Sequence, residues 1–363
     1  MNSTRYDIVI IGAGPGGLAA GIKAKEAGKS YVIIEKGKKV FQGIIDSYPK
    51  GKSVYPTIPK GHEAPFPIRS LEPSKEKDPV EKYVEQIEAV VQSENLNIIY
   101  EEDFKDIEEE SEGYIVKTQK SQYSAKNIIL AFGSNIPNDL GLYGEAKTVA
   151  RKLENVEDYV WLHTLVLGGG NAAADIVAAL SKAKREAMSS MPVYWAHRKE
   201  TFRINKDTAR DLGEELLLGG QVKILQEAIP KIGEVDNDGI DRLYIHQTPG
   251  VSQRSEVFVY QGMSFPMKNV IACIGTQGPT GVFKNLDLKV IDREGIKSSD
   301  DQIILLDKNL QTSKDGIYAI GGSISPTIME IQGDGSTKEN KHPNLIYTAI
   351  KDALIAINGI LSQ

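Results

Sequence analysis

The hydrophobic and polar positions of the chain repeat one arrangement twice. An apolar run of strand length ends in a cluster of glycines, and a longer stretch with helical spacing follows it. In the first copy the run is RYDIVII (5–11), the glycines are Gly12, Gly14 and Gly17, and a second apolar run, SYVIIEKG (30–37), follows the helix. This order predicts a strand–helix–strand unit at the N-terminus.

The second copy lies near the middle of the chain. TLVLGGG (164–170) is its apolar run, Gly168, Gly170 and Ala173 form a GxGxxA pattern, and NAAADIVAALSKAK (171–184) has helical spacing before a further strand. Two such units predict an α/β fold class with two Rossmann-like dinucleotide-binding domains.

The residue types of the first unit suit a dinucleotide. Gly12 permits a tight turn, Gly14 lets the backbone approach a pyrophosphate, and Gly17 allows close packing of helix and strand. The N-terminus of the helix offers free N–H groups and positive potential to the phosphates. Glu35 ends the second strand, where its carboxylate accepts hydrogen bonds from a ribose diol.

The second unit has cations where the first has Glu35. Its second strand ends in His197, Arg198 and Lys199, and Arg203 follows closely. A carboxylate at this place favours a ribose 2′-hydroxyl, whereas cations favour a 2′-phosphate. The pattern therefore predicts a preference for NADPH over NADH; the alternative, that these are ordinary surface charges, stays open.

The remaining segments have simpler patterns. Residues 37–78 are rich in Pro, Gly, Ser and Lys and predict loop, and 78–95 have helical spacing. Residues 97–135 alternate like a small antiparallel sheet that returns to a core strand. Residues 332–341 (QGDGSTKENK) predict a flexible loop, either a solvated linker or a lid, and Pro343 predicts the first position of a C-terminal helix.

Two similar segments of the sequence predict the domain borders. AKNIILAFGSNIP (125–137) and MKNVIACIGTQGP (267–279) are each an apolar strand, a glycine, a polar turn and a proline. Paired crossings of this kind predict one domain inserted in another. We expect a discontinuous first domain of residues 1–140 and 276–363, and a second domain of residues 141–275.

Composition narrows the class of protein. The 363 residues are 40% hydrophobic and 25% charged, with a net charge of -6, which argues against a nucleic-acid partner. No apolar stretch approaches the ~20 residues of a membrane span, and the N-terminus lacks a secretory pattern. The expectation is a cytoplasmic protein without a membrane partner.

Cysteine usage excludes one kind of redox chemistry. Cys273 is the one cysteine of the sequence, so the chain forms no internal disulfide and no CxxC dithiol. Its setting, NVIACIGTQG, predicts an inert thiol in a buried strand. The histidines show no metal-ligand spacing, and no Ser/His/Asp set is evident. Trp161 and Trp195 are expected to pack inside the second domain.

The motifs together resemble those of the two-dinucleotide-fold flavoprotein reductases, in particular the low-molecular-weight thioredoxin reductase group. The resemblance covers nearly the whole chain and rests on GAGPGG with Glu35, AFGSN, GGGNAAAD, HRKETFR and GIYAIGG. It implies three-layer ββα domains, FAD in the first, NADPH in the inserted second, hydride transfer from NADPH to FAD, and a homodimer.

The glycine patterns and the resemblance together predict one set of cofactor-binding residues. Tyr48 is expected near the isoalloxazine, and His342 and Asn344 beside its pyrimidine edge, at the start of the last helix. The full set is Gly12, Ala13, Gly14, Pro15, Gly16, Gly17, Glu35, Lys36, Tyr48, Phe104, Gly133, Gly168, Gly170, Asn171, Ala172, His197, Arg198, Lys199, Arg203, Gly275, Gly321, Gly322, His342 and Asn344.

Three departures from the family patterns bear on the reaction. The CxxC that thioredoxin reductases place before the second glycine loop is missing, and Gly322 stands where the last FAD motif normally has Asp. Ser323 or a water is expected to substitute for that Asp. Ferredoxin–NADP reductases and bacillithiol-disulfide reductases also lack CxxC, but the latter carry a Cys in the first glycine loop, where this chain has Gly16.

The electron acceptor is therefore open among three possibilities. The first is a small molecule such as a low-molecular-weight disulfide or a quinone, and the second is a ferredoxin-like protein. The third is a flavin-binding sensor or regulatory subunit without turnover. An acidic protein partner would need a basic rim, for which loop lysines are the candidates: Lys50, Lys52, Lys60, Lys338 and Lys341.

Overall fold

The computed structural model divides the chain into two compact units. One is made of Met1–Ile136 and Thr276–Gln363, and the other of Pro137–Gly275. The residues that the structure describes are 5–48, 51–62, 65–76, 78–134, 136–138, 140, 149–232, 242–247, 259–292 and 302–363.

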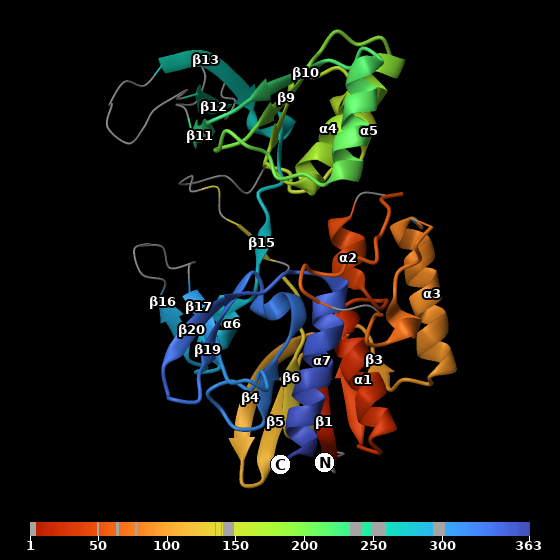
Figure 1. Cartoon of the computed structure of the whole chain (residues 1–363), viewed down its shortest axis with the longest axis vertical. Helices are drawn as coiled ribbons and strands as arrows, with labels where there is room; N and C mark the ends of the chain where they lie inside the picture. Colours follow the sequence, from red (N-terminus) through yellow and green to blue (C-terminus); the bar gives the residue numbers. More distant parts are fainter. Residues whose placement is uncertain are drawn as a thin grey trace. The chain divides into compact units, whose positions relative to one another are not determined.

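The first unit is built on a seven-stranded sheet (Figure 1). Its order is β3-β2-β1-β6-β5-β4, and β18 also pairs with β6. The strands are β1 (Arg5–Ile11), β2 (Tyr31–Ile34), β3 (Ile98–Ile99), β4 (Phe104–Glu110), β5 (Gly113–Thr118), β6 (Gln122–Leu130) and β18 (Ile317–Ala319).

Strand β6 joins the parallel and antiparallel parts of this sheet. It is parallel to β1 along its length, antiparallel to β5 in its first half and parallel to β18 in its second half. The apolar runs of β1 and β2 are buried, as expected of parallel strands covered on both faces. The carboxyl ends of β1, β6 and β18 consequently lie at one edge of the sheet.

Helices pack against this sheet. The helices α1 and α7 contact each other and lie side by side (Figure 1). The helical segments are α1 (Pro15–Glu26), α2 (Gln42–Ser47), α3 (Val80–Ser93), α6 (Thr280–Asn285), α7 (Ile346–Leu361), η1 (Arg69–Leu71) and η5 (Gly321–Ile324). Helix α3 (Val80–Ser93) is the helix that the sequence predicted within residues 78–95.

A second sheet of this unit corrects one expectation. Its order is β16-β17-β19-β20, with bounds β16 (Val290–Asp292), β17 (Gln302–Leu306), β19 (Thr327–Ile331) and β20 (Thr337–Lys341). The segment 332–341, expected as a flexible loop, is instead the turn and second strand of the β19–β20 hairpin. Asp334 accepts hydrogen bonds from the Ser336 N–H and hydroxyl, and Gly335 takes a positive φ of 84°, so the turn is closed locally.

The second unit contains a parallel sheet of order β10-β9-β8-β14 and an antiparallel sheet of order β11-β12-β13. Its elements are β8 (Thr164–Leu167), β9 (Val193–Ala196), β10 (Val222–Leu225), β11 (Ala228–Ile232), β12 (Arg242–Gln247), β13 (Val259–Pro266), β14 (Val270–Ala272), α4 (Asn171–Glu186), α5 (Lys206–Leu217), η3 (Val156–Tyr159) and η4 (Met267–Asn269). The two stretches where the chain passes between units, β7 (Ile136–Pro137) and β15 (Thr276–Gln277), pair with each other.

The parallel sheet of this unit separates two hydrophobic clusters. Leu165 and Leu167 join Phe265 on one face, whereas Val166 joins Ile176 of α4 on the other. This alternation follows the period-2 geometry of a strand. Trp195 is buried here as expected, but Trp161 is 65% exposed, so its predicted place in the packing was wrong.

Cys273 directly follows β14 and is half-buried rather than buried in a strand.

None of the described helices is long and apolar enough to cross a membrane.

A buried lysine closes the loop before β8. The ammonium of Lys184, on α4, donates to the carbonyl oxygens of Tyr159 (2.6 Å), Val160 (3.2 Å) and Leu162 (2.6 Å). The residue is 2% exposed, and burial lowers the pKa of Lys184 from its ordinary 10.5 to about 8. The side chain thus ties the end of η3 to α4.

Replacement of Lys184 by methionine is expected to lower the free energy of unfolding by roughly 2–4 kcal/mol, because three carbonyls lose their donor. Between pH 8 and 10.5 the unfolded chain holds more protons at this lysine, so the wild-type protein should gain stability relative to the variant as pH rises through that window. Urea unfolding of both proteins at several pH values measures this. The exposed Lys182 of the same helix provides the matched control, Lys182→Met, and equal effects of both changes would contradict the prediction.

Candidate functional site

Two of the three glycines of the first GxGxxG pattern have no room for a side chain, and the third has. Gly12 has φ +107°, and a Cβ there would lie 2.4 Å from the Ala131 carbonyl oxygen; a Cβ on Gly17 would lie 1.8 Å from the Gly12 oxygen. A Cβ on Gly14 would meet no atom within 4 Å. The loop therefore needs glycine at 12 and 17 for its own fold, whereas Gly14 borders open space that a ligand could fill.

Helix α1 begins at this loop with Pro15. Gly14 is its N-cap residue, in an extended conformation, and no side chain caps the helix. The unpartnered N–H groups of the first turn and their positive potential suit a phosphate.

Glu35 holds the loop to the end of β2. Its carboxylate accepts the N–H of Ala13 (2.7 Å) through one oxygen and the N–H of Gly37 (2.7 Å) through the other, and the residue is 6% exposed. Each oxygen keeps a further lone pair for a ribose hydroxyl. The neighbouring Lys36 is exposed.

The turn after β18 lies against the loop after β6. A Cβ on Gly322 would lie 2.8 Å from the Ser134 nitrogen and 3.1 Å from the Asn344 side-chain oxygen. The Asp that the family motif has at this position therefore has no room here. The Ser323 hydroxyl instead accepts the N–H of Gly133 (3.1 Å), which joins the two loops.

The last helix begins later than the sequence indicated. Helix α7 starts at Ile346, not at Pro343, because Leu345 is extended (φ -130°, ψ 152°) and the Asn344 amide donates to the Ser134 hydroxyl (2.5 Å). A Cβ on Gly16 would lie 3.2 Å from the Ala349 carbonyl oxygen, so the first turn of α7 is beside the first glycine loop.

An orphaned polar atom marks the same turn. No side chain caps α7, and the Thr348 hydroxyl is buried without a hydrogen-bond partner in the part of the chain that the structure describes. A buried hydroxyl and free helix N–H groups suit a ligand that brings acceptors and negative charge. Together with the space at Gly14, these groups fit FAD.

His342 is buried among polar partners. Its Nδ1 lies 2.8 Å from the Ser325 hydroxyl and its Nε2 lies 2.9 Å from Asp352 Oδ2, which also accepts the N–H of Gly321 (2.8 Å). A Ser/His/Asp set is thus present, although the sequence did not indicate one. Its three members come from separate elements, and the buried serine cannot act as a nucleophile on an outside substrate.

Two aromatic residues of the predicted set lie at the margins of this unit's core. Tyr48 follows α2 and is half-buried, with the Lys52 ammonium 4.7 Å from its ring centroid. Phe104, the first residue of β4, packs against Phe132 with ring centroids 5.2 Å apart. Phe132 directly precedes Gly133, so it joins the candidate site although the sequence did not single it out.

The second glycine loop repeats the first. Gly168 has φ +132°, and a Cβ there would lie 2.1 Å from the Cys273 carbonyl oxygen, whereas a Cβ on Gly170 would meet nothing within 4 Å. Gly169 also matters, since a Cβ there would lie 2.5 Å from the His197 ring. Gly170 is the N-cap residue of α4 and no side chain caps it, so this helix too presents free N–H groups beside open space.

Cations gather beside this loop. The N–H of Arg203 donates to the Gly169 carbonyl (2.6 Å), which returns the segment after β9 to the glycines. Burial lowers the pKa of His197, and the positive charges of Arg198, Lys199 and Arg203 lower it further. The three cations are exposed, and none of the carboxylates in the described ranges forms an ion pair with them. They are available to an anionic ligand.

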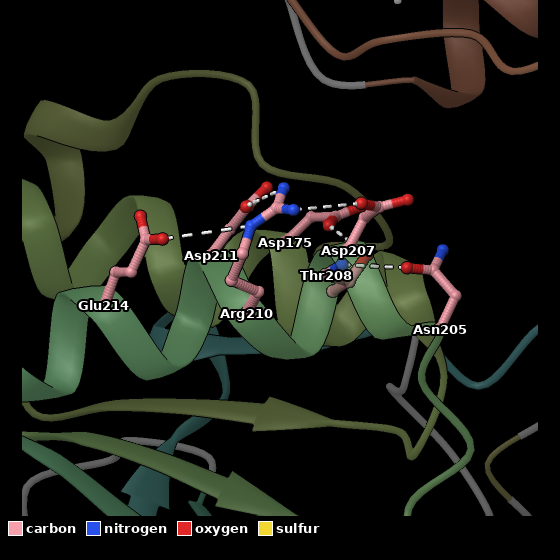
Figure 2. A network of polar contacts seen from close by, with 7 residues as sticks. All are labelled: Asp175, Asn205, Asp207, Thr208, Arg210, Asp211 and Glu214. Atoms are coloured by element: carbon pink, nitrogen blue, oxygen red, sulfur yellow. Dashed lines mark hydrogen bonds and ion pairs between the residues drawn. The ribbon is translucent and has the colours of Figure 1, made fainter.

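The cation near the start of α5 differs from these three, because acidic side chains of its own helix surround it (Figure 2). Arg210 lies among Asp207 (3.3 Å), Asp211 (3.0 Å) and Glu214 (3.8 Å), so its charge is compensated within the helix.

Two amides join this network to α4. The Asn205 side chain caps α5 by accepting the Thr208 N–H, and the Thr208 hydroxyl contacts Asp175 of α4 (Figure 2). Asn171, predicted to touch the cofactor, accepts the Asn205 N–H (2.8 Å). The neighbouring Ala172 is exposed in the first turn of α4.

Gly275, at the end of the second unit, has a different environment from the other predicted glycines. Its carbonyl accepts the Asn138 N–H (3.0 Å), and it takes a positive φ of 89°. These contacts hold the returning chain segment beside the outgoing one.

Among the described residues, no group of three or more His, Cys, Asp or Glu side chains could hold a metal ion.

Two glycine loops at helix starts, one beside a carboxylate and one beside cations, are the arrangement expected of a protein with two dinucleotide sites. The family of pyridine nucleotide-disulphide oxidoreductases matches residues 9–321, and the chain belongs to it. It is therefore an NAD(P)H-dependent flavoprotein oxidoreductase, and the expectation of FAD and NADPH as cofactors is confirmed at the level of the family.

Relatives cover nearly the whole chain. A ferredoxin–NADP reductase of Streptococcus agalactiae is 26% identical over 360 residues, 96% of each chain, and a thioredoxin reductase of Peptoclostridium acidaminophilum is 23% identical over 321 residues, 87% of this chain and 88% of that one. Among solved structures, bacillithiol disulfide reductase from Staphylococcus aureus has a TM-score of 0.73 at 18% identity, covering 99% of both chains. Thioredoxin reductase from Lactococcus lactis has a TM-score of 0.65 at 17% identity, covering 98% of both. The predicted two-domain Rossmann-like fold is confirmed.

Proposed function

We propose that the first unit binds FAD and the second binds NADPH, and that electrons pass from NADPH through FAD to a small acceptor, a low-molecular-weight disulfide or a quinone. The observation that carries this proposal is the single cysteine of the sequence. A reductase that stores electrons in its own dithiol needs two cysteines, so electrons leave the flavin of this chain directly. For a disulfide the balance is NADPH + H⁺ + RSSR → NADP⁺ + 2 RSH.

The position of Gly16 supports a direct route to the acceptor. Bacillithiol-disulfide reductases resemble this chain but have a cysteine at this position. In this chain a Cβ on Gly16 would lie 3.1 Å from Ile320 Cδ1 and 3.2 Å from the Ala349 carbonyl oxygen, so there is little space for a side chain. Cys273 belongs to the second unit, where its sulfur lies 4.0 Å from the Arg151 carbonyl oxygen. Position 16 therefore supplies no thiol to the first glycine loop.

Each nucleotide has its own set of groups in this proposal. When bound, FAD accepts a hydride from NADPH and releases an electron pair to the acceptor. The backbone at Gly14 and the start of α1 bind the FAD pyrophosphate, Glu35 the ribose, and the free N–H groups of α7 the negative charge of the reduced state. In the second unit, Gly170 borders the NADPH pyrophosphate and the three cations bind the 2′-phosphate.

A ferredoxin-like acceptor is the second candidate. The similarity to ferredoxin–NADP reductases over 96% of the chain favours it. In the candidate basic rim, Lys338 lies opposite Glu330 in the register of the β19–β20 hairpin, and the Lys52 ammonium lies over the Tyr48 ring. Lys341 is on the same hairpin and Lys60 is in an exposed turn, while Lys50 lies outside the described residues.

Anaerobic titration of the purified protein with NADPH and with NADH, followed at the flavin's visible absorbance, tests the proposal. Rapid bleaching by NADPH and slow bleaching by NADH is the expected result. Steady-state assays with a small disulfide, a quinone and a ferredoxin at several salt concentrations then separate the acceptors, since a protein acceptor gives strong salt dependence. A bound flavin that neither nucleotide reduces would overturn the proposal and favour a sensor.

Two further parts of the proposal rest on the family resemblance. We propose a homodimer, which sedimentation of the FAD-bound protein measures, and a cytoplasmic location, which fractionation of cells measures.

A further inference from the structure

The Ser325–His342–Asp352 set encloses one peptide unit. Asp352 Oδ2 accepts the Gly321 N–H (2.8 Å), and the Ser325 hydroxyl donates to the Gly321 carbonyl oxygen (3.3 Å). His342 joins the other two side chains through its two ring nitrogens. Both polar groups of the Gly321 backbone are thus held by one closed ring of hydrogen bonds, which we call the Gly321 clamp.

The clamp is buried and draws on three parts of the first unit. Ser325 (6% exposed) follows η5, His342 (6%) follows β20, and Asp352 (5%) is in α7. The backbone N–H of His342 donates to the Pro326 carbonyl (2.8 Å), which fixes the main chain at His342. These residues lie too deep for a side-chain contact with an outside molecule, so any effect of the clamp on a ligand must act through Gly321.

The Gly321–Gly322 turn borders the proposed FAD site. A Cβ on Gly321 would lie 3.1 Å from Ala349 Cβ in the first turn of α7, and a Cβ on Gly322 would lie 2.8 Å from the Ser134 nitrogen. Gly321 takes a positive φ of 65°, which glycine adopts without strain. A clamp on this peptide therefore fixes the wall between the first turn of α7 and the loop after β6.

One arrangement of the protons in the clamp gives a balanced pair of charges. Ser325 has one proton, and when it is donated to the Gly321 oxygen, the hydroxyl can only accept from His342 Nδ1. An ionised Asp352 can likewise only accept, so Nε2 carries a proton too. In this arrangement both ring nitrogens of His342 donate, and Nε2 lies 2.9 Å from the Asp352 carboxylate, whose charge a protonated imidazole balances.

We propose that His342 and Asp352 are positioning residues that hold the Gly321–Gly322 turn and, as a balanced ion pair beside the flavin site, set the reduction potential of the bound FAD. This inference rests on the proposed binding of FAD in the first unit. Removing one charge leaves the other uncompensated in a medium of low polarity, which changes the free energy of adding negative charge to the flavin.

The test uses two single variants with opposite charge effects. Asp352→Asn keeps an acceptor for the Gly321 N–H and removes the anion, so the potential should rise. His342→Gln removes the cation and leaves Asp352 ionised, so the potential should fall. Each shift should correspond to roughly a tenfold change in the equilibrium constant for flavin reduction. The FAD-bound proteins are titrated against a redox dye, and FAD content and visible spectrum are recorded for each.

The double variant and a control keep the test decisive. His342→Gln/Asp352→Asn restores neutrality and should return the potential to near the wild-type value, even where one single variant binds FAD poorly. Asp78→Asn removes another buried carboxylate of the same unit, which pairs with Lys82 at 2.7 Å, and should leave the potential unchanged. Shifts of equal sign in both single variants, or none, overturn the inference. Wild-type protein without FAD would instead overturn the proposed function.

Discussion

Gly14→Val is expected to produce a folded protein that binds FAD at least about a hundredfold more weakly, because its side chain takes the space in which the proposal places the pyrophosphate. Gly14 has φ -77° and ψ -176°, which valine also adopts, and no protein atom lies within 4 Å of its Cβ position. The loss corresponds to roughly 3 kcal/mol of binding free energy. Fluorescence titration of the apo-protein with FAD measures it, and thermal unfolding of the apo-protein should be unchanged.

Gly17→Val provides the contrast within the same loop. Its Cβ would lie 1.8 Å from the Gly12 carbonyl oxygen, so the chain itself must move and the first unit should lose several kcal/mol of stability. A Gly14→Val protein that retains full FAD content would show that no dinucleotide lies against this loop. If both variants unfolded alike, the distinction between the two glycines would be wrong.

Arg198→Gln/Arg203→Gln is expected to reduce kcat/KM for NADPH about a hundredfold and to leave kcat/KM for NADH nearly unchanged. Two charge-assisted hydrogen bonds to a 2′-phosphate at about 1.5 kcal/mol each supply this difference. Both arginines are exposed, and the backbone of Arg203 is tied to Gly169, so the variant should fold normally. Steady-state kinetics with both nucleotides measure the change.

Arg210→Gln is the matched control for this variant. Arg210 belongs to the same unit, but three carboxylates of α5 already compensate its charge. Its replacement should leave both kcat/KM values unchanged. An equal fall for NADPH and NADH in the double variant would mean that the arginines contact parts common to both nucleotides, and the assignment to the 2′-phosphate would be wrong.

The sequence by itself determined the features that depend on neighbours along the chain. A strand, a glycine turn and a helix start occupy fewer than twenty consecutive residues, so Gly12, Gly14 and Gly17 could be assigned roles without a fold. Glu35 and the cations from Arg198 to Arg203 follow directly from where the second strand of each unit ends. The missing dithiol needed only a count of cysteines.

Local turn chemistry explains one of the errors. The GDGS sequence of 333–336 was taken for part of a flexible loop, although Asp and Gly at these positions are also typical of a hairpin turn. The choice between the two depends on whether a partner strand is available, and β17 supplies an edge for β19. Pairing with a distant strand is a property of the fold.

Only the tertiary structure decided which residues meet across the unit. Ser325 follows η5, His342 follows β20 and Asp352 lies in α7, and the fold brings the three side chains together around Gly321. Gly169 and Gly322 are restricted by His197 and Ser134, which are distant in sequence. The start of α7 at Ile346 follows from the Asn344–Ser134 hydrogen bond. Such contacts depend on long-range packing, in which the free energy of burying apolar surface brings together residues that no local pattern connects.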